Sequence, residues 1–181
     1  YVGDGGYRSP YAIAADPTTG DLLVGYIDPG SGNRTFIQRI DPTNCTTEAI
    51  GNPAGSSRDR CAVLNTIGIG TLATGDGSTH ATFTIEVEPR TGDIYVGQRS
   101  GQISIFGANG TSKGKFSAFG NGNTNGQTNT VRGMAFDANG FMYVTVSEGT
   151  ANARVEIFAR TPDPITSLTG AYTSAAKTEA V

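Results

Sequence analysis

The chain has 181 residues, 36% hydrophobic and 16% charged, and its net charge of −3 is spread without blocks. This length supports one domain with a sizeable core, and the abundance of Gly, Thr, Ser and Asn favours short strands and tight turns over helices. The charge pattern excludes the basic surface of a nucleic-acid-binding protein, and no apolar run is long enough to span a bilayer.

The dominant feature is an internal repeat. Residues 2–25 and 74–97 align without a gap, and a looser third copy runs from Val131 to Thr145. The first two copies carry identical residues at Gly3/Gly75, Asp4/Asp76, Gly5/Gly77, Ile13/Ile85, Pro17/Pro89, Thr19/Thr91, Gly20/Gly92, Asp21/Asp93, Val24/Val96 and Gly25/Gly97. Repetition at this scale predicts a stack of like units, none of which can bury its own apolar face alone.

Each unit is predicted to contain a Gly-rich lead-in, a strand, a turn of Asp, Pro, Gly or Asn, and further strands. In chain order, the first strands are 11–15, 83–87 and 132–136, the turns are 16–21, 88–93 and 137–140, and the second strands are 22–24, 94–96 and 141–144. The third strands are 36–40, 102–106 and 154–158, and outer strands are expected within 62–72 and 115–119. Arg39 occupies a third-strand position where an aliphatic residue is expected.

The order of strand, DPxTGD turn, [LI][LY]VG strand and a strand ending in Ile or Phe resembles the NHL repeat of β-propellers, and also the looser repeats of lactonase-type six-bladed propellers. The resemblance implies an all-β fold of four-stranded antiparallel blades. We place about three blades at residues 1–73, 74–119 and 120–161, with an insertion at 45–61 and a linker or loosely ordered tail at 162–181. The interval from Glu88 to Asp137 fits one blade, and the longer interval from Asp16 to Glu88 fits a blade plus the insertion.

Three blades leave the propeller incomplete, because closed propellers have about four to eight. The chain is either an excerpt of a larger propeller, or half of a six-bladed ring of two copies, or a ring closed by a degenerate fourth blade from the insertion and the tail. The start at Tyr1, without Met, favours the first alternative.

Cys45 and Cys61 are the only cysteines, and they bracket a stretch with no strand or helix periodicity. Their spacing and setting favour a disulfide that closes this loop, worth about 3 kcal/mol, over two unrelated buried thiols. A disulfide predicts a secreted or cell-surface protein. The N-x-[ST] triplets at Asn33, Asn44 and Asn109 are candidate glycosylation sites and are compatible with that location.

Few residues are candidates for binding a ligand. His80 is the only histidine, which excludes a multi-His zinc site, and its Gly-rich surroundings favour a solvated loop residue. Glu86 and Arg132 fall on first strands, nearest the central channel of a propeller, where they face a ligand, form a structural ion pair or point into water. The carboxylates that recur in the units are interpreted as turn residues, with calcium ligation as the alternative. They are Asp4, Asp16, Asp21, Asp76, Glu88, Asp93 and Asp137.

These observations favour a non-enzymatic module that binds protein or glycan through its loops, or that assembles with further copies of itself into a ring or a filament. The alternative is a metal-assisted lactonase or lyase with its site in the channel. No catalytic residue is assigned, because no residue set of the lactonase-like propellers can be matched to this chain. No cofactor is indicated apart from the calcium alternative.

Overall fold

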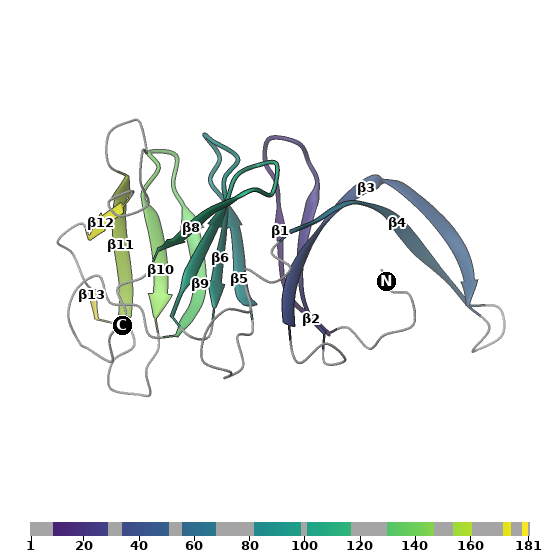
Figure 1. Ribbon diagram of the computed structural model, residues 1–181, viewed down its shortest axis with the longest axis horizontal. Helices are drawn as coiled ribbons and strands as arrows, with labels where there is room; N and C mark the ends of the chain where they lie inside the picture. The colour runs from purple at the N-terminus through teal and green to yellow at the C-terminus, as the bar shows by residue number, and fades with distance from the viewer. Residues whose placement is uncertain are drawn as a thin grey trace.

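The structure is a computed structural model of the chain, and every β-strand in it is antiparallel to its neighbours. It describes residues 9–28, 34–50, 56–67, 82–98, 101–116, 130–146, 154–160, 172–174 and 179–180. These residues form three sheets that stand side by side, which confirms the predicted all-β fold of three blade-like units (Figure 1).

The strands follow one another within each sheet in chain order, as in a propeller blade. Blade 1 contains β1 (Ser9–Ala15), β2 (Leu22–Asp28), β3 (Arg34–Ile50) and β4 (Ser56–Ile67). Blade 2 contains β5 (Thr82–Val87), β6 (Ile94–Gln98), β7 (Ile103–Phe106) and β8 (Ser112–Phe116). Blade 3 contains β9 (Val131–Phe136), β10 (Met142–Val146), β11 (Arg154–Arg160) and β12 (Tyr172–Ser174), and β13 (Glu179–Ala180) also pairs with β11.

The strand register shows that the three blades are built alike. The second strand of each blade begins with a residue paired to equivalent partners on both sides: Leu22 with Ala15 and Ile40, Ile94 with Val87 and Phe106, and Met142 with Phe136 and Phe158. The first strand of each blade also carries a register shift at the same place, opposite Tyr26, Gln98 and Val146. The repeat seen in the sequence is therefore a repeat of strand pairing.

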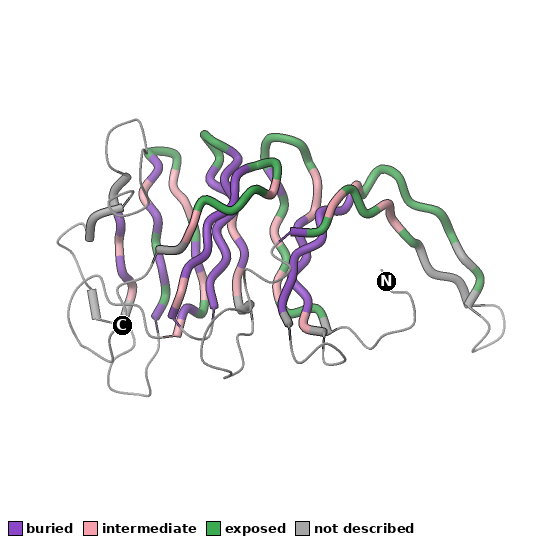
Figure 2. Tube along the Cα trace, viewed as in Figure 1, coloured by how far each residue is buried: buried purple, intermediate pink, exposed green. Residues whose placement is uncertain are grey.

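The first strands β1, β5 and β9 are the inner strands, because β5 packs against β1 and β9 packs against β5. Two apolar cores fill the space between successive blades, and the side chains of blade 2 alternate so that this blade contributes to both cores. Between blades 1 and 2 the buried residues are Leu23, Ile37, Ile67, Ile85, Val87, Ile94, Val96 and Phe106. Between blades 2 and 3 they are Tyr95, Ile103, Ile105, Val131, Met134, Met142, Val144, Val146 and Phe158. The middle strands of blade 2, β6 and β7, are thus buried at every residue and are purple in Figure 2.

The segment bracketed by the cysteines departs from the sequence prediction. It was expected to be a loop without strand structure, but β3 continues to Ile50 and pairs with β4 from Ser56 onward. We call residues 41–61 the arm; it arches away from the blades on the right of Figure 1. Described residues 42–47 are all exposed, so this stretch has no buried face and needs no alternation of apolar and polar residues. That is why periodicity did not reveal it.

The end of the chain also contributes to the last blade. The sequence predicted a linker or loosely ordered tail over 162–181, whereas β12 pairs residues 172–174 with residues 158–160 of β11. A strand of three residues is too short to carry a periodic signal. Among the described residues, no helix is long and apolar enough to cross a membrane.

Candidate functional site

One end of the blades gathers most of the described loops. The first-to-second-strand turns, at 16–21, 88–93 and 137–141, lie at the same end as the β7–β8 turn at 107–111 and the arm, because neighbouring strands are antiparallel. We call this end the turn face; it is at the top of Figure 1. Exposed residues concentrate there and along the arm (Figure 2).

The first two turns share one hydrogen-bonding pattern. The Asp16 N–H donates to the Asp21 carbonyl at 2.8 Å, and the Gly20 N–H donates to the Asp16 carbonyl at 2.8 Å. The equivalent bonds of the second turn, from the N–H groups of Glu88 and Gly92, measure 2.9 and 2.8 Å. Gly20 has a φ of 81°, in the left-handed region that glycine adopts at least cost. The DPTTGD and EPRTGD motifs are therefore signatures of a turn.

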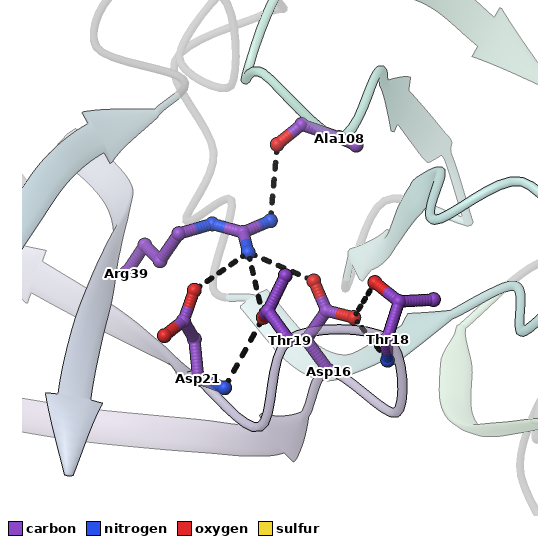
Figure 3. A network of polar contacts seen from close by, with 6 residues as sticks. All are labelled: Asp16, Thr18, Thr19, Asp21, Arg39 and Ala108. Atoms are coloured by element: carbon purple, nitrogen blue, oxygen red, sulfur yellow. Dashed lines mark hydrogen bonds and ion pairs between the residues drawn. The ribbon is translucent and has the colours of Figure 1, made fainter. Parts of the chain in front are cut away.

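Asp16 is the buried centre of the first turn, with 1% of its surface exposed. Its Oδ1 accepts hydrogen bonds from the Thr18 hydroxyl at 2.7 Å and the Thr18 N–H at 2.9 Å, and its Oδ2 accepts one from Arg39 at 2.8 Å (Figure 3). Burial alone would raise the pKa of Asp16, but the bonds from Thr18 and Arg39 together outweigh it and hold the pKa below its usual value. Asp16 is therefore ionised at neutral pH.

Arg39 links blade 1 to blade 2 across the turn face. Its Nη1 also donates to Asp21 Oδ2 at 3.0 Å and to the Thr19 hydroxyl at 3.3 Å, and its Nη2 donates to the carbonyl oxygen of Ala108 in the β7–β8 turn at 3.0 Å (Figure 3). A planar guanidinium can make these bonds at once, whereas a lysine ammonium is a single point of charge. The buried side chain therefore acts as a clamp between neighbouring blades.

The sequence carries a signal for this clamp, because Arg39 occupies an aliphatic position of the repeat. By register Arg39 lies opposite Leu23, the place that Ile105 holds opposite Tyr95 and Ile157 holds opposite Tyr143. A charged residue at an aliphatic position of a repeat needs a buried partner of opposite charge. The acidic residues of the DPTTGD turn are those partners.

Blade 2 makes the corresponding contacts with other residues. Asp93 accepts two hydrogen bonds from the half-exposed Lys113 ammonium, both at 2.7 Å, and Glu88 accepts a short hydrogen bond from the Thr91 hydroxyl. The Arg90 guanidinium donates to the backbone carbonyl of Asn139, in the turn of blade 3, at 3.4 Å. Successive blades are thus joined by an arginine-to-carbonyl bond on the turn face.

The turn of blade 3 is held by Asp137. Its Oδ1 accepts hydrogen bonds from the N–H groups of Asn139 and Phe141, both at 2.9 Å, and its Oδ2 accepts one from the Tyr143 hydroxyl at 3.4 Å. Desolvation would raise the pKa of Asp137, but these hydrogen bonds outweigh it and lower the pKa. The bonds to Asp16, Glu88 and Asp137 are those expected of turn residues. The side chains of Asp21 and Asp93 instead accept from Arg39 and Lys113, and Asp4 and Asp76 lie outside the described residues. Within the described ranges, no group of three or more His, Cys, Asp or Glu residues could hold a metal ion.

The arm is held by the predicted disulfide. Cys45 and Cys61 face each other across β3 and β4 and are bonded, with sixteen residues of sequence separation. Next to the bond, Asp41 accepts hydrogen bonds from the Thr43 N–H at 2.8 Å and the Thr43 hydroxyl at 2.6 Å. Bonds from Thr43 lower the pKa of Asp41. The arm is therefore covalently closed near the place where it leaves the blade.

Two of the three glycosylation triplets fall on the turn face. Asn44 lies in the arm and Asn109 in the β7–β8 turn, and both are exposed. The Asn109 side chain accepts a hydrogen bond from the Thr111 N–H at 3.0 Å, so it also shapes its own turn. Asn33 lies outside the described residues, as does His80.

The structure places the two remaining candidates on adjacent inner strands. Glu86 on β5 is half-buried, and burial raises the pKa of its carboxyl. Arg132 on β9 is exposed, and it is the residue skipped by the register shift between Val131 and Gly133. A bulge of this kind re-aims one side chain out of the ladder. Glu86 and Arg132 therefore lie on the neighbouring inner strands β5 and β9.

Comparison with known proteins supports the architecture and nothing finer. No family model matches the chain, and no curated protein sequence is similar to it. A crystal structure of RRP9 WD40 repeats aligns with a TM-score of 0.56 at 13% identity, covering 97% of this chain and 39% of that one. A structure of U3-55K aligns with a TM-score of 0.55 at 12% identity, covering 97% of this chain and 40% of that one. The chain thus spans about two fifths of each of these proteins, and it folds as three antiparallel blades like part of a WD40 β-propeller.

Proposed function

We propose that the chain is a secreted or cell-surface β-propeller module that binds a protein partner through its turn face, with the arm as the main contact. The observation that carries the proposal is the arm itself. It is a two-stranded ribbon, closed by the Cys45–Cys61 disulfide, that projects from the blades with residues 42–47 exposed. Residues 42–47 are exposed and bury no part of the core, so a role for this stretch is sought outside the domain.

The arm offers edges to which a partner strand could add. β4 is the last strand of its sheet, and β2 pairs with β3 only over residues 34–40. Among the described residues, the outer edge of β3 from residue 41 to 50 therefore has no neighbouring strand. Backbone groups along such an edge bind an extended peptide by strand addition, with side chains supplying specificity. This favours a protein partner over a glycan.

The extracellular location rests on the disulfide, because thiols of this kind stay reduced in the cytosol. Exposed Asn44 and Asn109 are compatible with that location and are the glycosylation sites we propose, together with Asn33. The propeller subtype stays a prediction as well. The DPTTGD and EPRTGD motifs favour the NHL type, whereas one of the structures compared above consists of WD40 repeats.

Replacing residues 42–61 by Asn-Gly tests the proposal. This two-residue turn closes Asp41 onto Ala62, which are already paired, and leaves β3 and β4 in the blade without a free cysteine. The matched control is Gln102→Glu, at the opposite end of blade 2. Immobilised proteins are then compared against a panel of purified extracellular proteins and a glycan array.

We expect the unaltered chain and the Gln102→Glu control to retain the same protein, and the variant without the arm to lose it. Equal retention by all three would remove the arm from the interface. Binding confined to the glycan array, and unaffected by loss of the arm, would replace the protein-binding function with a glycan-binding one.

One observation supports the second candidate, a metal-assisted lactonase or lyase. Glu86 is a half-buried carboxylate with a raised pKa on an inner strand, the environment in which an enzyme keeps an acid or base. Metal analysis and lactone hydrolysis assays address it. Stoichiometric calcium and lactone-cleaving activity that both disappear in Glu86→Gln would favour the enzyme, and activity retained in that variant would dismiss Glu86 from the role.

A further inference from the structure

The register shifts of the inner strands single out one residue in each blade. The ladder between the first and second strands skips Tyr11 in blade 1, Phe83 in blade 2 and Arg132 in blade 3. A bulge of this kind turns a side chain out of the ladder and is found especially often beside binding sites. Tyr11 is 51% exposed, and Arg132 is exposed as well. An accessible aromatic ring and an accessible guanidinium thus stand at equivalent places of the first and last inner strands.

The three bulges form a row across the inner strands, because β5 packs against both β1 and β9. They lie at the end of these strands opposite the turn face, since each turn follows the other end. The residue after each bulge is small, namely Ala12, Thr84 or Gly133. Tyr11 and Arg132 are therefore the large side chains that the structure describes along the row.

We propose that this row binds an acidic oligosaccharide, with the Tyr11 ring against the face of one sugar and the Arg132 guanidinium on the carboxylate or sulfate of another. An exposed aromatic ring offers a flat apolar surface to the C–H groups of a sugar. A guanidinium matches a carboxylate or sulfate with two parallel hydrogen bonds. A ligand that contacts both residues has to cross β5, so it contains more than one sugar ring.

The same bulges favour a sugar chain over an extended peptide. Among the described strands, β1, β5 and β9 are each the first strand at the edge of a sheet. Such an edge accepts a peptide by strand addition, but a bulge interrupts the regular spacing of the backbone groups that an added strand would pair with. Recognition at this end is therefore left to side chains. Glu86 lies one residue before the turn-face end of β5, so its carboxylate is separate from the row.

Isothermal titration of the whole chain with matched sugars tests the proposal. The probes are a galacturonic acid tetramer, its methyl ester and a sulfated galactose tetramer. We expect the chain to bind at least one of the two acidic probes, and to bind the methyl ester about tenfold or more weakly than the acid if the carboxylate is the preferred anion. The sulfated probe shows which of the two anions the guanidinium prefers.

Substitutions at Arg132 should act on the charge of the ligand. Arg132→Gln should weaken binding of the preferred acidic probe by about tenfold or more and leave the methyl ester unaffected, and Arg132→Lys should give an intermediate loss because it keeps the charge but not the paired hydrogen bonds. Lys113→Gln is the matched control. It removes one positive charge from a half-exposed side chain on β8, away from the row, and should leave sugar binding unchanged.

Substitutions at Tyr11 should act on all sugars alike. Tyr11→Ser should weaken binding of the acid and of the ester by the same factor, whereas Tyr11→Phe keeps the ring and should retain binding. Leu64→Ser is the control here, because Leu64 is 53% exposed but lies on the outer strand β4. Circular dichroism checks that the variants fold.

Several results would overturn the proposal. They are failure of both acidic probes to bind, equal affinity for the acid and its ester together with no binding of the sulfated probe, and binding that is insensitive to Arg132→Gln. Equal affinity for a polyglutamate peptide would replace the sugar with an acidic peptide. The variant without the arm should bind the sugar as the unaltered chain does, so this site and partner binding through the arm are judged separately.

Discussion

The Arg39 guanidinium in blade 1 donates a hydrogen bond of 3.0 Å to the backbone carbonyl oxygen of Ala108 in blade 2, while it also holds Asp16 and Asp21 of its own blade. Removing this side chain should leave Asp16 as a buried carboxylate without its cation. We therefore expect Arg39→Ile, which installs the residue that blades 2 and 3 carry at this position, to lower the free energy of unfolding by about 3 kcal/mol. Urea titration measures the change.

A second substitution separates the unpaired charge from lost packing. Arg39→Ile combined with Asp16→Asn should recover part of the stability, because the buried negative charge is then absent. By contrast, Lys113→Met removes the half-exposed partner of Asp93 and should cost no more than about 1 kcal/mol, since water screens that pair. If Arg39→Ile and Lys113→Met lowered the free energy of unfolding equally, the buried Arg39 clamp would stabilise the fold no more than the half-exposed Lys113 pair does.

The depressed pKa of Asp16 makes stability depend on acid pH. Its usual value is 3.8, and the folded value is lower, so its contribution is complete above pH 3.8 and is lost as the pH falls through the folded pKa. Unfolding free energies measured between about pH 2 and pH 5 should therefore decline toward low pH. Asp16→Asn should make the free energy of unfolding depend less on pH in this range. If the pH dependence were unchanged in that variant, other titrating groups would be its cause.

Glu86 should act in the opposite direction. Burial raises its pKa above the usual 4.5, so the fold favours the neutral acid, and that contribution is present below pH 4.5 and is lost as the pH rises through the folded value. At neutral pH, Glu86→Gln should raise the unfolding free energy, by no more than about 1 kcal/mol because the side chain is only half-buried. Near pH 3 the two proteins should unfold alike. A loss of stability at neutral pH would mean that the ionised carboxylate is held by a favourable contact.

The close approach of blades 2 and 3 at Gly97 leaves no room for a side chain. A Cβ there would lie 2.5 Å from a Val131 methyl and 2.6 Å from the Thr84 methyl. Gly97→Ala should overpack the interface and cost about 1–3 kcal/mol in thermal or urea unfolding. A neutral result would imply that the two blades are farther apart than described.

The disulfide of the arm should contribute to stability through the unfolded chain. Cys45→Ser with Cys61→Ser should lower the free energy of unfolding by about 3 kcal/mol, the loop-closure value for a crosslink of this span. Denaturant titration of both proteins, each confirmed monomeric or dimeric by light scattering, measures it. Quantitative thiol labelling of the unreduced wild-type protein should find no free cysteine, and full labelling of both would contradict the bond.

The sequence predicted the repeat, the strand-turn-strand core of each blade and the disulfide, because these features depend on local chemistry. Asp, Pro and Gly fix the turns, and apolar residues at alternate positions reveal strands such as β7 and β11. Alternation did not predict their burial, because Ser104 and Glu156 at the polar positions are buried as well. The sequence did not predict the strands of the arm, because an exposed ribbon needs no alternation of apolar and polar residues. The sequence did not predict the role of Arg39. Its partners are Asp16 and Asp21 in an earlier turn and Ala108 in the next blade, and contacts between residues so far apart in the sequence produce no periodic pattern.

The candidate site was predictable only in part. That Glu86 and Arg132 lie on inner strands followed from the blade resemblance and agrees with the strand order. The bulge that singles out Arg132 did not, since it depends on the pairing of Thr145 and Val146 in the next strand. The turn face could not be predicted from the sequence, because only the strand pairing shows that its five connections lie at the same end of the blades.

Contact between the aromatic rings of Tyr95 and Phe136 tests most directly whether successive repeats pack as neighbouring blades. Their centroids lie 5.0 Å apart across the boundary between blades 2 and 3. Nuclear Overhauser spectroscopy on protein with labelled aromatic residues should give cross-peaks between the two rings, alongside those within each sheet. Strong cross-peaks within the sheets but none between Tyr95 and Phe136 would contradict the stacked-blade architecture.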